Sequence, residues 1–330
     1  MIYYNDLEEL VFTRHKETKA DELIVLSGYV GPVPVMKLSD LPFGSQVIYG
    51  MYQSDGIKLG LHNILKEVTV NSDATKVLYA EMPIHSKCYI WRKSGLIESA
   101  LIGSANFTKT GLTTPYKEIL SDVQTESYKP LNEYLNGILE TSKLCTEFTD
   151  EQCIRLNMNP SFEYLNQKLR ESVCNMPLYS VRENKVPEKS GLNWGLANAH
   201  VSEGDAYIGI TTELINDYPS LFPPKQESSS IIIPGSRINR KNDPVELIWD
   251  DGTVMEGLLE GNLDVNGITY PNKLCSCPKK NLLGKYLRNR LGVDINHLIT
   301  LEDLKKYGRT SIGITLIGDG VYEMDFSPKQ

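Results

Sequence analysis

The chain has 330 residues, a hydrophobic content of 41%, a charged content of 23% and a formal net charge of −8. Its length allows two domains, its composition is that of a globular protein, and its acidity argues against nonspecific coating of nucleic acid. A local basic face is still compatible with this acidity, because nucleic-acid binding depends on one patch and not on the sum. The first residues are acidic, unlike a secretion signal, and no apolar run is as long as a membrane span. We therefore expect no membrane association and a cytoplasmic location.

The first half of the chain alternates strand patterns with helix patterns. Residues 21–28 and 45–50 are short apolar runs that end in glycine, which is typical of buried strands. Apolar residues at helical spacing predict helices over 57–68 and 131–139. Between these helices, two strands at 84–92 and 96–103 flank a Lys-Ser-Gly turn. This alternation predicts an α/β domain with a mixed sheet flanked by helices.

Polar side chains gather at the open end of that predicted hairpin. The start of its first strand lies beside the end of its second, which brings His85 close to Ser104 and Asn106. A strand alternates faces with a period of two, so His85 and Lys87 point the same way. Ser104 and Asn106 share one direction too if the extended chain continues through them. We expect the four side chains to converge on one patch.

This patch has the chemistry to cleave a phosphodiester without a metal ion. Lys87 supplies a fixed cation, and Ser104 and Asn106 supply neutral donors for the charge that develops on the phosphoryl oxygens. A neutral imidazole at His85 can attack phosphorus to form a phosphohistidine, and a second histidine is then needed as the acid for the leaving oxygen. Of the five histidines in the chain, only His85 stands in a His-x-Lys pair. We therefore expect a homodimer through this domain, with the active centre on the two-fold axis.

The segments HSK and GSANFT resemble the half-motif of the phospholipase D superfamily, in its bacterial nuclease branch. The superfamily pattern has an aspartate four residues after the lysine, and Trp91 stands there in this chain. Nuclease members also carry a glutamate about a dozen residues after the asparagine. Glu118 matches that place, and the resemblance implies that it orients the groups around it.

The second half of the chain has a different pattern. Residues 142–190 are less regular and more polar, and we expect a linker at 176–189 between a domain at 1–175 and another at 190–330. Helices are predicted at 281–291, stopped by a glycine, and after Thr300, whose spacing to Asp303 is that of a capping box. Strands are predicted at 206–211, 229–233, 245–249, 254–259, 311–317 and 321–326, two pairs of them joined by tight turns. Short strands with tight turns and two helices favour a small, mainly-β, barrel-like domain.

Three segments of this second half are candidates for DNA contact. No acidic residue occurs from Val265 to Val293, while that stretch holds Lys273, Lys279, Lys280, Lys285, Arg288 and Arg290. These side chains are either a phosphate-binding surface or the solvated basic face of a helix. Arg237 and Arg240 belong to a second basic loop, whose side chains have the chemistry to pair with base edges. The segment with Trp194, Asn198 and His200 is either a core anchor and its loop or a DNA-reading arm.

We predict no metal and no cofactor. The six cysteines lack the spacing of a disulfide framework, which is typical of reduced thiols in a cytosolic protein. Cys275 and Cys277 have no second Cys or His pair at zinc-finger spacing. The phosphate-loop pattern Gly-x-x-x-x-Gly-Lys-Ser/Thr is absent, so any use of ATP would require another protein.

The whole chain resembles the NgoFVII-type restriction endonucleases of bacteria, through segments such as SGLNWG, ELIWDDGTVMEGLLEG and LLGKYLRNRLGV. The resemblance implies a phospholipase D-like nuclease domain followed by a pseudobarrel similar to the DNA-binding domain of plant B-three transcription factors. It implies two DNA-reading arms, around Trp194–Ser202 and Asn262–Lys280. It also implies a cognate methyltransferase, and in some members an ATPase partner subunit.

Together these patterns predict a metal-independent endonuclease that cuts double-stranded DNA at a specific sequence. Two alternatives stay open at this point. One is a sequence-specific DNA-binding protein whose nuclease domain is inactive. The other is a lipid hydrolase of the phospholipase D type, which would be expected to carry an amphipathic membrane helix.

Overall fold

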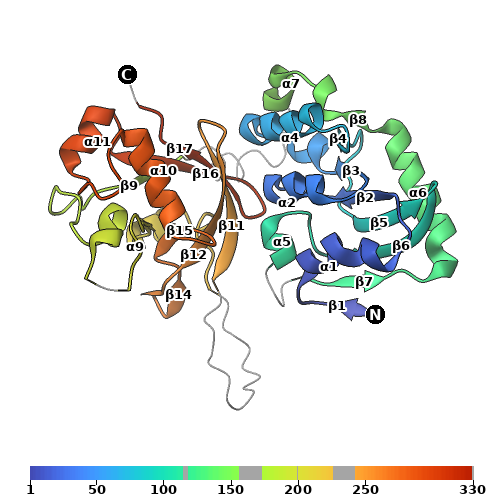
Figure 1. Ribbon diagram of the computed structural model, residues 1–330, viewed down its shortest axis with the longest axis horizontal. Coiled ribbons are helices and arrows are strands. Elements are labelled where there is room, and N and C mark those ends of the chain that lie inside the picture. The colour runs from blue at the N-terminus through green and yellow to red at the C-terminus, as the bar shows by residue number, and fades with distance from the viewer. Residues whose placement is uncertain (114–117, 156–172, 199, 226–241, 329–330) are drawn as a thin grey trace, which may run out of the picture. The chain divides into compact units, whose positions relative to one another are not determined.

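The computed structural model describes residues 1–330 except 114–117, 156–172, 199, 226–241 and 329–330 (Figure 1). The chain divides into two compact units, Met1–Glu163 with Ile317–Val321 and Tyr164–Leu316 with Tyr322–Gln330. None of the helices in the described part of the chain combines the length and the apolar character that crossing a membrane requires.

The first unit is built of strands and helices that alternate along the chain, as predicted. In order they are β1 (Ile2–Tyr3), α1 (Leu7–Thr13), η1 (Arg14–Glu17), β2 (Glu22–Ser27), α2 (Pro32–Met36), η2 (Lys37–Asp40), β3 (Gly44–Tyr49), α3 (Tyr52–Asp55), α4 (Leu59–Asn71), β4 (Thr75–Tyr79), β5 (Lys87–Lys93), β6 (Leu96–Gly103), α5 (Lys109–Thr113), β7 (Leu120–Asp122), η3 (Thr125–Ser127), α6 (Tyr128–Thr141), β8 (Lys143–Leu144), η4 (Cys145–Glu147) and α7 (Asp150–Arg155).

These strands form one eight-stranded mixed sheet in the order β1-β7-β6-β5-β2-β3-β4-β8. Strands β2, β3 and β4 run parallel, and β5 is antiparallel to β2. Leu135 and Ile138 of α6 pack against Ile24 and Ile90 on one face of the sheet. On the other face, His62 of α4 is hydrogen bonded to Tyr79 (Nδ1 to Oη, 2.9 Å). The fold is therefore the predicted mixed sheet flanked by helices, with α6 on one side and α2 and α4 on the other (Figure 1).

The hairpin of β5 and β6 is present, with Lys87 paired to Gly103 at its open end. Its turn uses the left-handed region at Ser94 (φ 50°) and Gly95 (φ 81°). The prediction that the first strand begins at residue 84 was wrong, because β5 begins at Lys87. The backbone N–H of Ile84 donates instead to the carbonyl of Gly50 (2.9 Å), which directs the chain before Lys87 toward the end of β3.

The second unit contains β9 (Cys174–Pro177), η5 (Gly191–Leu196), β10 (Ile208–Gly209), α9 (Thr212–Asp217), β11 (Asp243–Trp249), β12 (Val254–Glu260), β13 (Leu263–Val265), β14 (Ile268–Tyr270), β15 (Lys273–Ser276), α10 (Asn281–Leu291), α11 (Leu301–Tyr307), β16 (Ser311–Gly318) and β17 (Val321–Asp325). Seven of these strands form a sheet in the order β10-β15-β12-β11-β17-β16-β9, and its end strands β10 and β9 lie near each other. Trp249, Phe222 and Leu287 are among the side chains of its core. The result is the predicted mainly-β, barrel-like domain.

The predicted helices and several predicted strands of this unit are confirmed. Helix α10 spans the expected residues and ends at Gly292, which has a left-handed φ of 68°. Helix α11 begins with the expected capping box of Thr300 and Asp303. Of the predicted strand at 206–211, only Ile208–Gly209 forms a strand, and the predicted strand at 229–233 lies outside the described residues.

Strand β9 was not predicted. It lies across residue 175, where the first domain was expected to end, and it pairs with β16 of the second sheet (Cys174 with Ile314, Pro177 with Ser311). Strand β15 was also missed, although it carries Lys273 and links β10 to β12.

Candidate functional site

Three of the predicted site residues meet around Gly28, the residue that follows β2. A Cβ atom built on Gly28 would lie 2.9 Å from Cδ2 of His85, 3.2 Å from Nζ of Lys87 and 3.5 Å from Oδ1 of Asn106. The neighbouring strands β2 and β5 and the segment after β6 bring these groups together. The expected convergence therefore exists for His85, Lys87 and Asn106, and a side chain at Gly28 would force the imidazole of His85 to shift.

Lys87 is 5% exposed, and its ammonium group donates to the carbonyl oxygen of His85 (2.6 Å). Burial lowers the pKa of Lys87, and the negative charge of the nearby Glu118 opposes that effect. Glu118 is half-buried. The predicted cation and the predicted carboxylate thus interact electrostatically at this site.

The amide of Asn106 is buried and held at its oxygen. Oδ1 accepts a hydrogen bond from the backbone N–H of Tyr29 (3.2 Å) and lies 3.4 Å from the hydroxyl of Ser27. This assignment of the amide makes Nδ2 the atom that can donate to a phosphoryl oxygen.

Ser104 lies on the exposed side of the same region. Its hydroxyl accepts from the backbone N–H of Ile119 (3.1 Å), and its own N–H donates to the carbonyl of Ile119 (3.0 Å). Ser104 is therefore joined to the segment that carries Glu118, and it is not among the groups nearest to Gly28. A hydroxyl that accepts in this way retains its hydrogen for donation.

Trp91, at the position where the superfamily pattern has an aspartate, is fully buried in β5. It lies opposite Leu23 of β2 and Ser99 of β6. Trp91 is thus part of the hydrophobic core of the first unit and provides no carboxylate.

Two residues beside the site were missed in the sequence. Gly28 is the point of close approach described above, and the ring of Tyr29 contacts the imidazole of His85 edge-on, with centroids 6.0 Å apart and planes at 80°. The hydroxyl of Tyr29 donates to Asp55. The sequence feature that could have indicated Gly28 is its place at the end of a buried strand, where glycine often allows other groups to approach the backbone closely.

In the second unit, three of the predicted DNA-binding residues form a cluster. Nζ of Lys273 and Nζ of Lys280 each lie 5.0 Å from the centroid of the Trp194 ring. Lys273 also lies over Tyr207 (4.7 Å), and the Tyr207 ring is 5.4 Å from that of Trp194. Residues 194, 207, 273 and 280 are called the basic-aromatic cluster below. Tyr207 was not predicted.

Glu260 holds one lysine of the basic-aromatic cluster in place. Its carboxylate accepts from Nζ of Lys280 (2.7 and 3.0 Å) and from Sγ of Cys275 (3.2 Å). Burial raises the pKa of Glu260, but the hydrogen bonds of Lys280 and Cys275 outweigh it and keep that pKa below its ordinary value. Burial and the adjacent Glu260 raise the pKa of Cys275, which keeps this sulfur a protonated thiol. Within the described residues, no group of three or more His, Cys, Asp or Glu side chains is arranged to hold a metal ion.

The other predicted DNA-binding residues are not part of this cluster. Asn198, His200 and Lys279 are exposed, and Arg237 and Arg240 lie outside the described residues.

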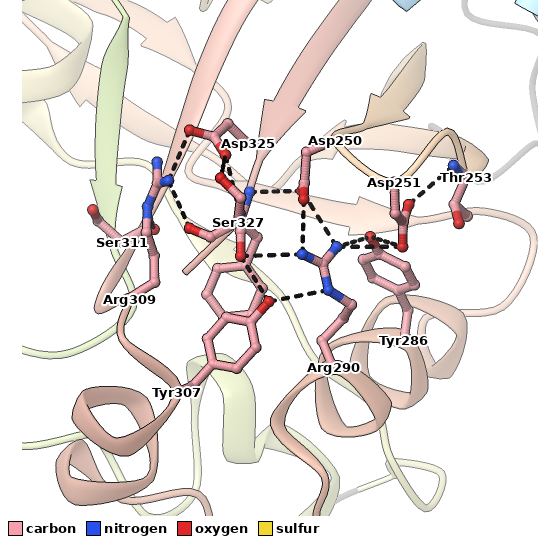
Figure 2. A network of polar contacts seen from close by, with 11 residues as sticks. Asp250, Asp251, Thr253, Tyr286, Arg290, Tyr307, Arg309, Ser311, Asp325 and Ser327 are labelled. Carbon is pink, nitrogen blue, oxygen red and sulfur yellow. Dashed lines mark hydrogen bonds and ion pairs between the residues drawn. The ribbon is translucent and has the colours of Figure 1, made fainter. Parts of the chain in front are cut away.

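The expectation that Arg288 and Arg290 belong to the basic surface was wrong. Arg288 is 2% exposed and donates to Asn193 and to the carbonyl of His297 (3.4 Å each). Arg290 donates to Asp250 and Tyr307, in the network of Figure 2. Both guanidinium groups attach α10 to the rest of the second unit.

A cavity of about 750 Å³ lies in the second unit, beside the end strands β9 and β10 of the seven-stranded sheet. Its lining is mostly apolar and comes from the residues around β9, β10 and α9, among them Leu178, Ile208 and Leu214. Tyr207 of the basic-aromatic cluster also lines it.

The fold and these sites define a phospholipase D-like domain joined to a DNA-binding domain. Family models match both parts: the NgoFVII restriction endonuclease N-terminal PLD domain over residues 5–152, and the NgoFVII C-terminal B3-like DNA-binding domain over residues 169–318. The chain belongs to the NgoFVII restriction endonuclease family.

Among solved structures, NucT from Helicobacter pylori is 16% identical, with a TM-score of 0.31, and the match covers 43% of this chain and 96% of that one. The phospholipase D family member Nuc from Salmonella typhimurium is 13% identical, with a TM-score of 0.30, over 41% of this chain and 88% of that one. No curated protein matches the chain.

Proposed function

We propose that this protein is a homodimeric, metal-independent endonuclease that cuts double-stranded DNA at a specific sequence through a phosphohistidine on His85. The observation that carries the proposal is the meeting of His85, Lys87 and Asn106 around Gly28, in a chain that also has a DNA-binding domain.

In the first step, a ring nitrogen of neutral His85 attacks phosphorus, and the nitrogen–phosphorus bond forms as one bridging phosphorus–oxygen bond breaks. The leaving oxygen takes a proton from the imidazolium of His85 of the partner subunit. In the second step, water attacks phosphorus, the phosphorus–nitrogen bond breaks, and the neutral His85 of the partner subunit accepts the proton of the water. Each histidine thus returns to its starting state.

The groups around His85 stabilise charge on the phosphoryl oxygens during both steps. Lys87 contributes its positive charge, and Asn106 and Ser104 contribute N–H and O–H donors. Glu118 acts through Lys87, because its negative charge favours the positively charged form of that lysine. Each subunit supplies one set of these groups to the shared centre.

In the second unit, the basic-aromatic cluster provides phosphate contacts, because two ammonium groups each lie 5.0 Å from the centroid of one aromatic ring there. Lys279, Asn198, His200, Arg237 and Arg240 are the further candidates for DNA contact. A cognate methyltransferase belongs to the proposal, and any ATP dependence would come from an ATPase partner subunit.

The test is incubation of the purified protein with plasmid and phage DNA in excess EDTA. Discrete fragments that disappear with His85→Ala, while the specific gel shift is retained, support the proposal. His297→Gln is the matched control, because His297 is an exposed histidine of the second unit and should not affect cleavage. Cleavage by pure His85→Ala at the wild-type rate would overturn the assignment of the nucleophile.

Two other outcomes point to the alternatives. A specific gel shift without nicking, also after addition of ATP and the neighbouring gene products, would favour a DNA-binding protein with an inactive nuclease domain. Hydrolysis of liposomes without cleavage of DNA would favour a lipid hydrolase.

A further inference from the structure

We propose that Tyr29, anchored by Asp55, is a positioning residue that orients the imidazole of His85 and the amide of Asn106 together. The inference rests on the proposed function and adds to it two residues from outside the hairpin that carries His85.

The backbone of Tyr29 is tied to the segment after β6. Its N–H donates to Oδ1 of Asn106 (3.2 Å), and its carbonyl oxygen accepts from the hydroxyl of Ser27 (2.6 Å). That hydroxyl in turn accepts from the N–H of Phe107 (2.9 Å), and the N–H of Gly31 donates to the carbonyl of Phe107 (2.8 Å). These bonds hold Tyr29 in a fixed place relative to Asn106.

The side chain of Tyr29 reaches from this fixed backbone to His85. Its ring contacts the imidazole edge-on, with centroids 6.0 Å apart, and packs against Tyr49 at 6.4 Å. Its hydroxyl donates to Asp55, which ends α3 and also accepts from the hydroxyl of Ser54 (2.9 Å). The ring is therefore held at both ends, by the backbone and by Asp55.

His85 needs such support because its side chain is exposed and precedes β5. An exposed side chain changes rotamers readily, whereas attack on phosphorus requires the ring nitrogen in one place. Lys87 bonds only the backbone carbonyl of His85, so that bond does not orient the imidazole. The edge-on ring of Tyr29 supplies a contact to the imidazole itself.

The test compares full-length variants in single-turnover cleavage with saturating cognate DNA. Tyr29→Leu removes both the ring and the anchor, and we expect a fall of about 100-fold, the cost of misplacing a reacting group by about 1 Å. Tyr29→Phe and Asp55→Asn keep the ring and loosen its anchor, and we expect a fall of about tenfold, since part of the contact remains. The specific gel shift should not change, because the DNA-binding domain is untouched.

Tyr3→Phe is the matched control. Tyr3 donates to Asp122 (3.1 Å), so this variant removes a tyrosine–aspartate hydrogen bond of the same chemistry from the same unit. Wild-type cleavage by Tyr3→Phe together with slow cleavage by Tyr29→Phe would separate positioning from a general loss of stability.

A second readout does not depend on cleavage. In protein labelled with ¹³C-histidine, the His85 ring signals, assigned by their absence in His85→Ala, should move strongly in Tyr29→Leu and less in Tyr29→Phe. The signals of His62 and His15, which lie elsewhere in the first unit, should stay in place and show that the fold is intact.

The outcomes separate the two proposals. If the wild-type protein does not cleave DNA, also after addition of ATP and the neighbouring gene products, the proposed function fails, and the histidine spectra alone decide whether Tyr29 orients His85. If the wild-type protein cleaves, and folded Tyr29→Leu cleaves at the same rate with unchanged His85 signals, the positioning role is overturned.

Discussion

The ammonium group of Lys87 donates a hydrogen bond of 2.6 Å to the carbonyl oxygen of His85, so the predicted nucleophile and its neighbouring cation are linked through the backbone. The same ammonium group would lie 3.2 Å from a Cβ atom on Gly28. The ammonium group of Lys87 is thus held beside both His85 and Gly28.

Replacement of Lys87 by methionine should slow DNA cleavage by about 10²- to 10³-fold, because one preorganised charge on the phosphoryl oxygens is lost. The rate is measured under single turnover, where binding does not limit it. Lys93→Met is the control, since Lys93 is an exposed lysine at the other end of β5. Equal rates for the two variants would remove Lys87 from the active centre.

Addition of one methyl group at Gly28 should slow cleavage by about 100-fold, the cost of misplacing a reacting group by about 1 Å. In Gly28→Ala the new Cβ would lie 2.9 Å from Cδ2 of His85, so the imidazole must move. DNA binding should be retained, because the change lies outside the DNA-binding domain. Cleavage by Gly28→Ala at the wild-type rate would contradict the close approach of these groups.

Gly137→Ala is the matched control for that variant. Gly137 lies inside α6, and a Cβ atom there would meet nothing within 4 Å. It should cleave normally and raise the free energy of unfolding by up to about 1 kcal/mol, the difference between alanine and glycine in a helix.

Much of this site could be predicted from local patterns, and the rest depends on contacts between distant segments. The predicted hairpin pairs Lys87 with Gly103, three residues before Asn106. His85 lies near both groups although it precedes β5, so the period of a strand does not account for its position. Tyr29 was missed because it reaches His85 only when β2 lies beside β5, and no short-range pattern encodes that neighbour.

The same limit explains the correction at α10. Arg288 and Arg290 were expected on a basic surface because their stretch of the chain lacks acidic residues, but their partners Asn193 and Asp250 come from remote segments. Lys273 and Lys280 were predicted to contact DNA for a local reason, because the sequence around them has no acidic residue. Their position near the ring of Trp194, in η5, follows from the tertiary fold.

Replacement of Lys273 by glutamine should weaken DNA binding about equally for cognate and unrelated sequences. The physical reason is the loss of a phosphate contact, which also reduces the slope of log affinity against log salt by about one. The measurement is a titration at several salt concentrations. Lys306→Gln, an exposed lysine of α11, should leave both the affinity and the slope unchanged. A change confined to the cognate sequence would instead indicate a base contact by Lys273.

Replacement of Arg290 by methionine should destabilise the second unit. Its guanidinium group donates to Asp250 (2.8 Å) and to Tyr307 (3.1 Å), and both it and Asp250 are mostly buried (Figure 2). Removal of one partner of such a pair leaves a carboxylate without its counterion, at a cost of about 3 kcal/mol. Urea unfolding of the full chain measures the loss, and Lys285→Met, at an exposed position of the same helix, is the control. Equal stability of the two variants would contradict this account of Arg290.

Glu8 should make the stability of the first unit sensitive to acid. Its carboxylate is paired with Lys37 (2.7 Å) and Lys109 (3.2 Å), and although burial raises its pKa, these lysines bring that pKa below the ordinary 4.5. A carboxylate whose pKa is lowered by folding stabilises the folded state fully above its unfolded pKa, and this contribution is lost as the pH falls through the folded pKa. At neutral pH, Glu8→Gln should therefore cost about 1 kcal/mol, the upper range for a partly exposed ion pair.

The wild-type protein and Glu8→Gln should become equal in stability as the pH falls below 4.5. Urea unfolding at neutral pH and through the acid range measures this convergence. Glu9→Gln is the matched control, because Glu9 is the exposed neighbour in the same first turn of α1. A difference in stability between the wild-type protein and Glu8→Gln that is the same at every pH would contradict this account. It would show that the difference does not come from the negative charge of Glu8.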